Sequence, residues 1–309
     1  MMVLVTGASG FIGRRLMVRL AESKRSIRGV VRPGPSGARR YDNFPTETVE
    51  TLNGTTCWSR LLRDVSSVVH CAAVAHGKSG DIRAVNVCGT LNLASQAAEA
   101  GVQRFVFLSS IGVNGNSNTF PFSEADLPKP EGLYAQSKLE AEQGLWELHK
   151  RTGMEVVILR PPLVYGPDAP GNFGSLVRLV QKGVPLPLGA IDNKRSLLAL
   201  DNLVDLILNC IDHPAAANQV FLASDGEDLS TTELLKAVGR AMGKPARLVP
   251  VPASILMLGA SLSGNKAFAQ RLLGSLQIDI SKACKVLNWE PPLTVEEGLR
   301  RCFDSENVS

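Results

Sequence analysis

A tyrosine and a lysine stand four residues apart at the start of a helical stretch, in the run Tyr134-Ala-Gln-Ser-Lys138. Residues at positions i and i+4 lie on one face of a helix, so the lysine ammonium can approach the phenol from the same side. A nearby cation favours the phenolate, and we expect it to lower the pKa of Tyr134 from its usual value of about 10. The pair could then exchange a proton with an alcohol or a ketone near neutral pH.

A second set of polar side chains follows a buried strand upstream of this helix. The run Arg104-Phe-Val-Phe-Leu108 reads as a strand that delivers Ser109 and Ser110 at its C-terminal end, where ligands bind in open parallel sheets. Ser110 could instead cap a turn with its hydroxyl, and Tyr134 could simply pack on its helix beside an exposed lysine. The combination of the three side chains favours a proton-handling site.

Three glycines follow the first apolar run of the chain, in Thr6-Gly7-Ala-Ser-Gly10-Phe-Ile-Gly13. The first permits a tight turn, the second lets backbone N–H groups approach a pyrophosphate, and the third lets a helix pack close to the sheet. The anion would lie at the positive end of that helix. Such a turn can serve packing alone, but its place between two predicted strands favours a dinucleotide site. The predicted contacts in this loop are Gly7, Ser9, Gly10, Phe11, Ile12 and Gly13.

The residue after the second predicted strand bears on the choice of cofactor. An NAD site usually offers a carboxylate there for the ribose 2′-hydroxyl, whereas this chain has Val30-Val-Arg32-Pro-Gly34. A guanidinium can hold a 2′-phosphate with two hydrogen bonds. The sequence therefore favours NADP(H), with NAD(H) as the alternative if Arg32 is only a surface arginine that ends a strand.

The elements that must position these residues alternate along the first half of the chain. Short apolar, β-branched runs are separated by longer helical stretches, which is typical of a parallel sheet with crossover helices. The predicted fold is α/β, a Rossmann-type doubly wound parallel sheet with a smaller C-terminal α/β substrate-binding lobe. We predict strands at residues 3–5, 26–31, 68–70, 104–108 and 155–159, and helices at 10–22, 82–100 and 134–151.

A cluster of prolines and glycines at residues 161–171 ends this alternation, because such a stretch suits neither a helix nor a central strand. We place the first domain boundary there. The dinucleotide-binding domain would comprise residues 1–162 and a return segment of about 191–213, in which residues 195–200 rejoin the sheet as a strand and a helix follows. Residues 163–190 and 214–309 would form the substrate-binding lobe.

The composition narrows the class of protein. Hydrophobic residues make up 44% of the 309 and charged residues 20%, as in ordinary globular proteins. A net charge of +4 is too small and diffuse to indicate nucleic acid. The six cysteines form no CxxC pair and the four histidines lack metal-ligand spacing, so we expect no disulfides in a reducing cytoplasm and no metal. The apolar segment 253–262 is too short to cross a membrane and is expected in the core of the lobe. The opening residues do not resemble a signal peptide.

Seven motifs spread along nearly the whole chain resemble those of the extended short-chain dehydrogenase/reductase superfamily. The resemblance is to its branch of NAD(P)-dependent nucleotide-sugar epimerases, dehydratases and 4-ketoreductases. The motifs are Thr6-Gly-x-x-Gly-x-x-Gly13, Asp64…Val69-His70-Cys-Ala-Ala73, Asn86-Val-x-Gly-Thr90-x-Asn92-Leu, Leu108-Ser-Ser110, Tyr134-x-x-Ser-Lys138, Leu159-Arg-Pro161…Tyr165-Gly166-Pro167 and Leu287-Asn-Trp289-x-Pro291.

The resemblance implies a role for each matching position. Tyr134 would be the catalytic acid and base, and Lys138 would lower its pKa and bind the nicotinamide ribose. Ser110 would donate a hydrogen bond to the reacting C4 oxygen. Further cofactor contacts would come from Ala72, Ala73, Asn86 and Pro161, and the nucleotide sugar would meet Arg195 at its diphosphate, with Asn172 and Arg271 as additional candidates.

Three departures from the family pattern are visible. The residues after Ser110 are Ile-Gly-Val-Asn-Gly instead of a small residue, threonine and Tyr-Gly. In the family, an acidic residue that follows the third strand of the sheet commonly contacts the adenine. The corresponding residues here, 50–53, offer only Thr51 near that position. After Arg195, the run Ser196-Leu-Leu-Ala199 replaces the usual Asp-Phe-x-His.

Arg32 and the altered segment after Ser110 favour one reaction, the NADPH-dependent reduction of the C4 ketone of a nucleotide-linked 4-keto-6-deoxyhexose, N-acetylated or not. Its product would enter surface polysaccharide or O-antigen synthesis as part of lipopolysaccharide. The alternative is a UDP-hexose 4-epimerase with tightly bound NAD. A dehydratase would need acidic residues next to Ser110, and a purely cofactor-binding relative would have lost the tyrosine or the lysine. The resemblance also suggests a UDP-linked substrate and a homodimer formed by the helices at 82–100 and 134–151.

Overall fold

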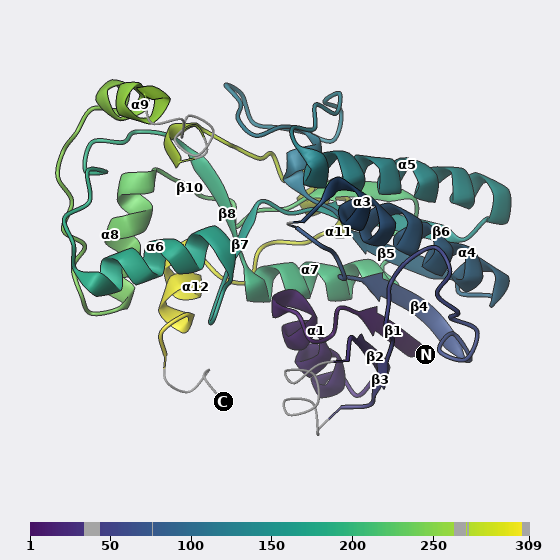
Figure 1. Ribbon diagram of the computed structural model, residues 1–309. Coiled ribbons are helices and arrows are strands. Elements are labelled where there is room, and N and C mark those ends of the chain that lie inside the picture. Colours follow the sequence, from purple (N-terminus) through teal and green to yellow (C-terminus); the bar gives the residue numbers. More distant parts are fainter. Residues whose placement is uncertain (34–43, 76, 263–269, 271, 305–309) are drawn as a thin grey trace.

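The computed structural model describes residues 1–33, 44–75, 77–262, 270 and 272–304 (Figure 1). Its main sheet has seven parallel strands in the order β3-β2-β1-β4-β5-β6-β9. This order is the Rossmann arrangement, with β1 between the two halves. The strands are β1 (Met2–Thr6), β2 (Ser26–Val31), β3 (Thr46–Thr48), β4 (Val65–His70), β5 (Arg104–Leu108), β6 (Glu155–Arg160) and β9 (Gln219–Leu222).

Helices cover both faces of this sheet (Figure 1). Successive side chains of a strand point to opposite faces, so Val3 and Val5 pack in one apolar cluster with α1 (Phe11–Glu22) and α7 (Leu200–Asp212). Leu4, between them, belongs to the opposite cluster with α4 (Thr90–Glu99) and α5 (Leu133–Thr152). A sheet buried on both faces explains why its central strands are rich in apolar residues on both faces. The predicted fold class is confirmed.

The predicted elements of the first half are present, with two differences. The helix predicted at 82–100 is made of α3 (Ser79–Arg83), a π-helical turn (Ala84–Gly89) and α4. The strand β3 was not predicted, because its sequence Thr46-Glu-Thr48 contains no apolar residue. α5 begins at Leu133 and ends at Thr152, and the next residue, Gly153, caps it with a left-handed φ of 75°, a conformation that glycine adopts without strain.

A second sheet of three strands lies in the lobe on the other side of the molecule (Figure 1). The elements are β7 (Leu163–Tyr165), α6 (Gly171–Lys182), β8 (Arg195–Ala199), β10 (Asp228–Leu229), α8 (Thr231–Ala241), α9 (Ala253–Leu262) and α12 (Val295–Arg301), while α11 (Ser281–Leu287) packs with α1 and α7. The strand order is β10-β8-β7. The apolar core of the lobe contains buried side chains from β7, β8 and three helices, α6, α8 and α12, whereas β10 and α9 contribute only partly buried ones.

The strand predicted to rejoin the main sheet was assigned to the wrong sheet. β8 pairs with β7 and β10, and the strand that pairs with β6 is β9, inside the segment predicted to belong to the lobe. The helix after β8, α7, does pack on the main sheet as expected. Both strands are short apolar runs, and periodicity cannot say which sheet such a run joins. The domain limits at residues 162, 191 and 213 stay a prediction.

The apolar segment expected in the core of the lobe is only partly there. It forms α9, in which Ala253 and Leu256 pack against the lobe core, while Ile255 and Leu258 are 59% and 64% exposed. Among the described residues, no helix has the length and apolar character needed to span a membrane.

Candidate active site

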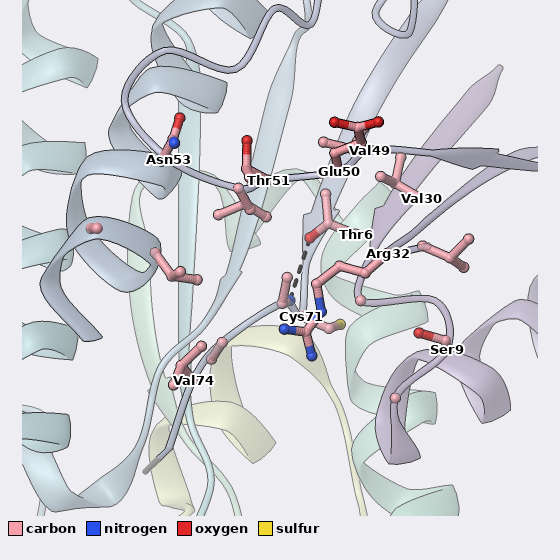
Figure 2. Close-up of a pocket in the computed structure, with 18 of the residues that line it drawn as sticks. Thr6, Ser9, Val30, Arg32, Val49, Glu50, Thr51, Asn53, Cys71 and Val74 are labelled. Carbon is pink, nitrogen blue, oxygen red and sulfur yellow. Dashed lines mark hydrogen bonds between the residues drawn. The ribbon is translucent and has the colours of Figure 1, made fainter. Parts of the chain in front are cut away.

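A cavity of about 390 Å³ opens at the carboxyl end of β1, the strand from which the order of the main sheet runs outward to β2 on one side and to β4 on the other. In doubly wound sheets the crevice at this position, outside the carboxyl ends of the strands, is where ligands bind. Its walls come from the ends of β1, β2 and β4 and from the segment after β3. Figure 2 shows Ser9, Arg32 and Thr51 arranged around it.

The glycine loop forms one side of the cavity and leaves no space for side chains. Gly7 has a φ of +67°, and a Cβ atom on it would lie 2.8 Å from the backbone nitrogen of Ala72. A Cβ atom on Gly13 would lie 2.1 Å from the Gly7 oxygen, so the helix could not pack here with any larger residue. The N-cap of α1 is Gly10, which offers no side chain to the first N–H groups of the helix. These groups can therefore bind an anion, and the loop fits the pyrophosphate of a dinucleotide.

Six of the predicted cofactor residues line the cavity, namely Gly7, Ser9, Gly10, Arg32, Ala72 and Ala73. Phe11 and Ile12 are half-buried and pack against the apolar core under α1, so only their backbone can face an anion. The sequence reasoning missed most of the opposite wall, where Glu50, Leu52 and Asn53 lie beside the predicted Thr51. The other lining residues that it missed are Thr6, Val30, Val31, Val49, Cys71, Val74, Asp81, Ala84 and Val85.

The structure brings Lys138 and Tyr134 together on one face of α5. Lys138 is 1% exposed, and its Nζ donates a hydrogen bond of 2.8 Å to the Leu108 carbonyl at the end of β5. The same nitrogen lies 4.5 Å from the centre of the Phe107 ring and 5.8 Å from that of Tyr134, within the range of cation–π attraction. Burial lowers the pKa of Lys138 to about 8, and the charge of Glu142 opposes this shift.

The expected direction of the tyrosine pKa shift was wrong for this structure. Burial raises the pKa of Tyr134 to about 12, whereas the neighbouring ammonium was expected to lower it. Removing a phenolate from water is therefore the larger influence here, although the Lys138 ammonium lies 5.8 Å from the centre of the ring. The phenol of Tyr134 therefore holds its proton, which suits it to act as an acid.

Ser110 lies two residues after the end of β5 and is the N-cap of a 3₁₀ turn (Ile111–Val113) that packs against α5. Its Oγ accepts a hydrogen bond of 3.1 Å from the Gly112 nitrogen, which is the capping role weighed as an alternative. A serine hydroxyl that accepts still has its own hydrogen to donate, so capping and substrate binding are compatible. A Cβ atom on Gly112 would lie 3.4 Å from the Cβ of Ala135, which places the strand end beside the helix that carries Tyr134.

Asn86 does not line the cavity but supports its wall. Its side chain accepts from the Val74 nitrogen at 2.8 Å and donates to the Val74 carbonyl at 2.9 Å. The same amide donates to Ser137 Oγ at 3.0 Å, and Ser137 donates to the Tyr134 carbonyl. Pro161 is buried and accepts a backbone hydrogen bond of 2.9 Å from Ile111. Asn86 therefore connects the cavity wall to α5, and Pro161 connects β6 to the turn after Ser110.

A buried ion pair lies behind the Tyr–Lys pair and was not predicted. Glu142 follows Lys138 by one helical turn, and its Oε2 lies 2.5 Å from Arg160 Nη2, with side-chain exposures of 2% and 7%. Ser109 donates to the same carboxylate, and Arg160 Nη1 donates to Asn114 at 3.0 Å. The pair thus joins α5, β6 and both ends of the segment that contains Ser110. The Leu-Arg-Pro motif was the only signal for it in the sequence.

Of the three residues predicted only for the nucleotide sugar, the structure describes Arg195 and Asn172, which lie on different elements of the lobe. Arg195 is half-buried at the start of β8 and donates to the Gly274 carbonyl at 3.0 Å, and burial lowers its pKa. Asn172 is exposed in the first turn of α6, and Arg271 lies outside the described residues. A second cavity of about 560 Å³ borders Gly274, between α9 and the loop before α5, and is lined by Asn116, Ser117, Glu131, Gly132, Ala253, Ser254, Met257, Gln270, Leu273 and Gly274. The roles of these three predicted residues stay predictions.

Comparison with known proteins agrees with this fold and arrangement. The chain is 45% identical over 310 residues to a UDP-glucose 4-epimerase of Vibrio cholerae, which covers 97% of this chain and 93% of the relative. It is 26% identical to an N-acetyl-alpha-D-glucosaminyl-diphospho-ditrans,octacis-undecaprenol 4-epimerase of Escherichia coli O157:H7, over 99% of this chain and 95% of the relative.

Solved structures and a family match complete the comparison. The UDP-glucuronic acid 4-epimerase of Bacillus cereus, solved in complex with NAD, superposes with a TM-score of 0.81 at 24% identity and covers 98% of this chain and 96% of that one. Residues 3–223 of the chain match the NAD dependent epimerase/dehydratase family. The glycine cradle, the Tyr–Lys pair and the Rossmann strand order lie within the matched segment, and the chain belongs to the NAD-dependent epimerase/dehydratase family.

Proposed function

We propose that this protein is a UDP-hexose 4-epimerase that works with a dinucleotide of the NAD type. The observation that carries the proposal is the end-to-end similarity to a UDP-glucose 4-epimerase. In this chain Tyr134 and Lys138 lie close together at the start of α5, and the hydrogen bonds of Ser137 and Asn86 connect that helix to the wall of the cavity. Inversion at C4 requires that the C4–H and O–H bonds break, that a ketone forms, and that both bonds form again on the other face. A bound nicotinamide cofactor supplies the acceptor and then the donor of the C4 hydride.

Tyr134 is the group that moves the hydroxyl proton at C4. In the first half of the reaction its phenol oxygen accepts that proton, and in the second half it returns a proton to the C4 oxygen of the inverted sugar. The raised pKa of the phenol favours the second half, and the Lys138 ammonium beside the ring lowers the cost of the first. Burial of the phenol and the nearby ammonium act on the pKa in opposite directions, so Tyr134 can both accept and return the proton.

Ser110 and the Lys138–Leu108 hydrogen bond fix the geometry of this transfer. Ser110 donates to the C4 oxygen, and because the Gly112 N–H holds its Oγ in place, no reorientation is needed as charge develops on that oxygen. The bond from Lys138 to the Leu108 carbonyl ties α5 to the end of β5. The tyrosine and the serine therefore keep their relative positions while the sugar turns.

Epimerisation is tested by incubating the purified protein with UDP-glucose, and separately with UDP-N-acetylglucosamine, without added cofactor. We expect the C4 epimer to appear in the proton NMR spectrum while the absorbance at 340 nm stays constant, since an internal redox cycle consumes no cofactor. The control is the same protein treated to remove bound nucleotide, which should regain activity with NAD⁺. Absence of any epimer from both sugars, with the cofactor bound, would rule the proposal out.

The second candidate is the 4-ketoreductase favoured by the sequence, and Arg32 is the observation that supports it. This exposed arginine lines the cavity at the end of β2, where a carboxylate would bind the 2′-hydroxyl of NAD. Against this candidate, the UDP-glucuronic acid 4-epimerase of Bacillus cereus was solved in complex with NAD, which supports an NAD-type cofactor. UDP-4-keto-6-deoxy-N-acetylhexosamine with NADPH tests this candidate, because reduction would oxidise NADPH in proportion to product.

Replacing Arg32 should reveal which dinucleotide the cradle prefers. If the guanidinium contacts a 2′-phosphate, Arg32→Ala should weaken NADP⁺ binding about tenfold or more and leave NAD⁺ binding within about twofold, because only one of the two carries that charge. Isothermal titration of both dinucleotides to both proteins measures this. Arg60→Ala is a suitable control, since Arg60 is an exposed arginine paired with Glu47 outside the cavity. Equal affinities of the wild type for the two dinucleotides would leave Arg32 without a role in selection.

The proposal also covers the substrate class, the oligomeric state, the location of the enzyme and the use of its product. We propose a UDP-linked substrate, a homodimer formed by the helices near α4 and α5, a cytoplasmic location, and use of the product in surface polysaccharides. The similarity to an epimerase that acts on an undecaprenol-linked sugar supports the last of these.

A further inference from the structure

A fully buried histidine joins two of the segments that build the dinucleotide cavity. His70 is the last residue of β4, and its ring stacks on Phe107 with the ring centres 6.0 Å apart. Its Nδ1 lies 2.7 Å from Oγ1 of Thr6, at the end of β1. Its Nε2 lies 2.9 Å from Oγ1 of Thr90, the first residue of α4. The proton transfer at C4 has no use for this side chain.

The neighbours of His70 determine which ring nitrogen carries the hydrogen. Thr90 donates its hydroxyl hydrogen to the Asn86 carbonyl at 2.8 Å, so toward the ring it can only accept. Nε2 is therefore the protonated nitrogen, and Nδ1 accepts from the hydroxyl of Thr6. Burial lowers the pKa of His70 to about 3, with a smaller contribution from the charge of Lys138. The ring is thus neutral at physiological pH.

The hydrogen bonds form one chain with a single direction. The Ala72 N–H donates to Thr6 Oγ1 at 3.4 Å, Thr6 donates to His70, His70 to Thr90, and Thr90 to Asn86. Hydrogen bonds that point the same way polarise and strengthen one another. A ring with a hydrogen on both nitrogens would break this order, because Thr6 would then face a donor.

Both ends of this series of hydrogen bonds reach the same wall of the cavity. At one end, Ala72 lies against the glycine loop, where a Cβ atom on Gly7 would be 2.8 Å from its nitrogen. At the other end, the side chain of Asn86 holds both backbone groups of Val74. Ala72 and Val74 line the cavity together with Gly7. A change at His70 is therefore transmitted to the width of the cradle.

We propose that His70 is a positioning residue of the dinucleotide cradle, which by joining Thr6 to Thr90 holds the glycine loop and the wall at residues 72–74 at a fixed separation. The inference rests on the proposed dinucleotide site and is independent of the reaction that takes place there. A cradle whose walls are held before binding loses less freedom when the ligand binds. Substitutions of His70 should therefore lower the affinity for the dinucleotide.

Three substitutions at one position separate the two hydrogen bonds. His70→Asn keeps an acceptor near the position of Nδ1, His70→Gln keeps a donor near that of Nε2, and His70→Phe keeps neither. Because the Thr6 bond lies on the cavity side, we expect the Kd for NAD⁺ to rise about threefold in the Asn variant and about tenfold or more in the Gln and Phe variants. Isothermal titration gives Kd, and the Tm of each variant is recorded separately.

Two threonine variants provide the matched comparison and do not depend on the histidine variants folding. Thr90→Val removes the hydroxyl at the far end of the ring and should raise the Kd about threefold. Thr152→Val removes a hydroxyl that also bonds the carbonyl four residues before it, Leu148 at 2.9 Å, but at the distant end of α5, and should leave the Kd unchanged. Comparing these two variants separates the effect of breaking the hydrogen bonds of His70 from the effect of removing a threonine hydroxyl from a helix.

The outcomes distinguish this inference from the proposed reaction. Variants at His70 and Thr90 that lower Tm but bind NAD⁺ within twofold of the wild type would reduce His70 to a packing residue. A wild type that binds neither NAD⁺ nor NADP⁺ would overturn the cradle and this inference with it. A wild type that binds NAD⁺ but leaves both UDP-glucose and UDP-N-acetylglucosamine unchanged would refute only the reaction, and the Kd series would still decide the role of His70.

Discussion

Tyr134→Phe should lower kcat for the proposed interconversion of UDP-sugars by about 10³-fold, because it removes the phenol oxygen that we propose carries the proton to and from C4. The phenyl ring stays beside Lys138, whose Nζ lies 5.8 Å from the ring centre and is held by the Leu108 carbonyl. The dinucleotide cavity does not include Tyr134, so the Kd for NAD⁺ should change less than about threefold. Steady-state kinetics and isothermal titration on the same preparation measure the two effects.

Tyr165→Phe is the matched control for this substitution. Tyr165 is a buried tyrosine in the lobe core whose hydroxyl donates to the Val295 carbonyl at 3.3 Å. Losing that hydroxyl should cost about 1 kcal/mol of stability and leave kcat unchanged. If Tyr134→Phe retained more than a tenth of the wild-type kcat, the proton would have to travel by another group and the assignment of Tyr134 would fail.

Arg160→Met should destabilise the fold more than any other change considered for this chain, by about 3–5 kcal/mol. It leaves the Glu142 carboxylate buried with the Ser109 hydroxyl but without its cation. Asn114 also loses the donor that holds it at 3.0 Å. Since domains of this size are stable by only about 5–15 kcal/mol, urea unfolding should show a large shift of the midpoint.

Removing both charges should undo most of that loss. In Glu142→Leu/Arg160→Met no buried charge is left unpaired, and such double replacements are often close to neutral. We expect the double variant to be at least about 2 kcal/mol more stable than Arg160→Met alone. Arg25→Met is the control for a surface pair, since Arg25 bonds Asp212, whose side chain is about half exposed, and it should cost less than about 1 kcal/mol. Similar losses in the single buried and surface variants would contradict the importance assigned to the buried pair.

Much of the fold was predictable because it depends on short segments. The strands that became β1, β2, β4, β5 and β6 were predicted from runs of three to six residues that are mostly apolar, and the glycine loop was predicted from three positions within one turn. Glycine is required at Gly7 for its φ of +67° and at Gly13 for the contact with Gly7, and both reasons are local. The family resemblance, confirmed by the comparisons, followed from such segments.

The assignment of strands to sheets was not predictable in the same way. β8 and β9 are runs of similar length and apolar character, yet β8 joins the lobe sheet and β9 the main sheet. The choice depends on which edge each strand reaches after the intervening helices have packed. That information lies in contacts between distant segments and not in either run.

For the site, the sequence by itself determined which residues could do chemistry: Tyr134, Lys138, Ser110 and the glycines, because residue type and spacing along one helix or one loop are local properties. Only the tertiary structure decided their electrostatic state and their support. The pKa of Tyr134 is raised and not lowered, since desolvation depends on everything packed around the phenol. Likewise the ion pair of Glu142 with Arg160 and the contacts of His70 with β1 and α4 arise between residues far apart in the chain, where no local pattern records them.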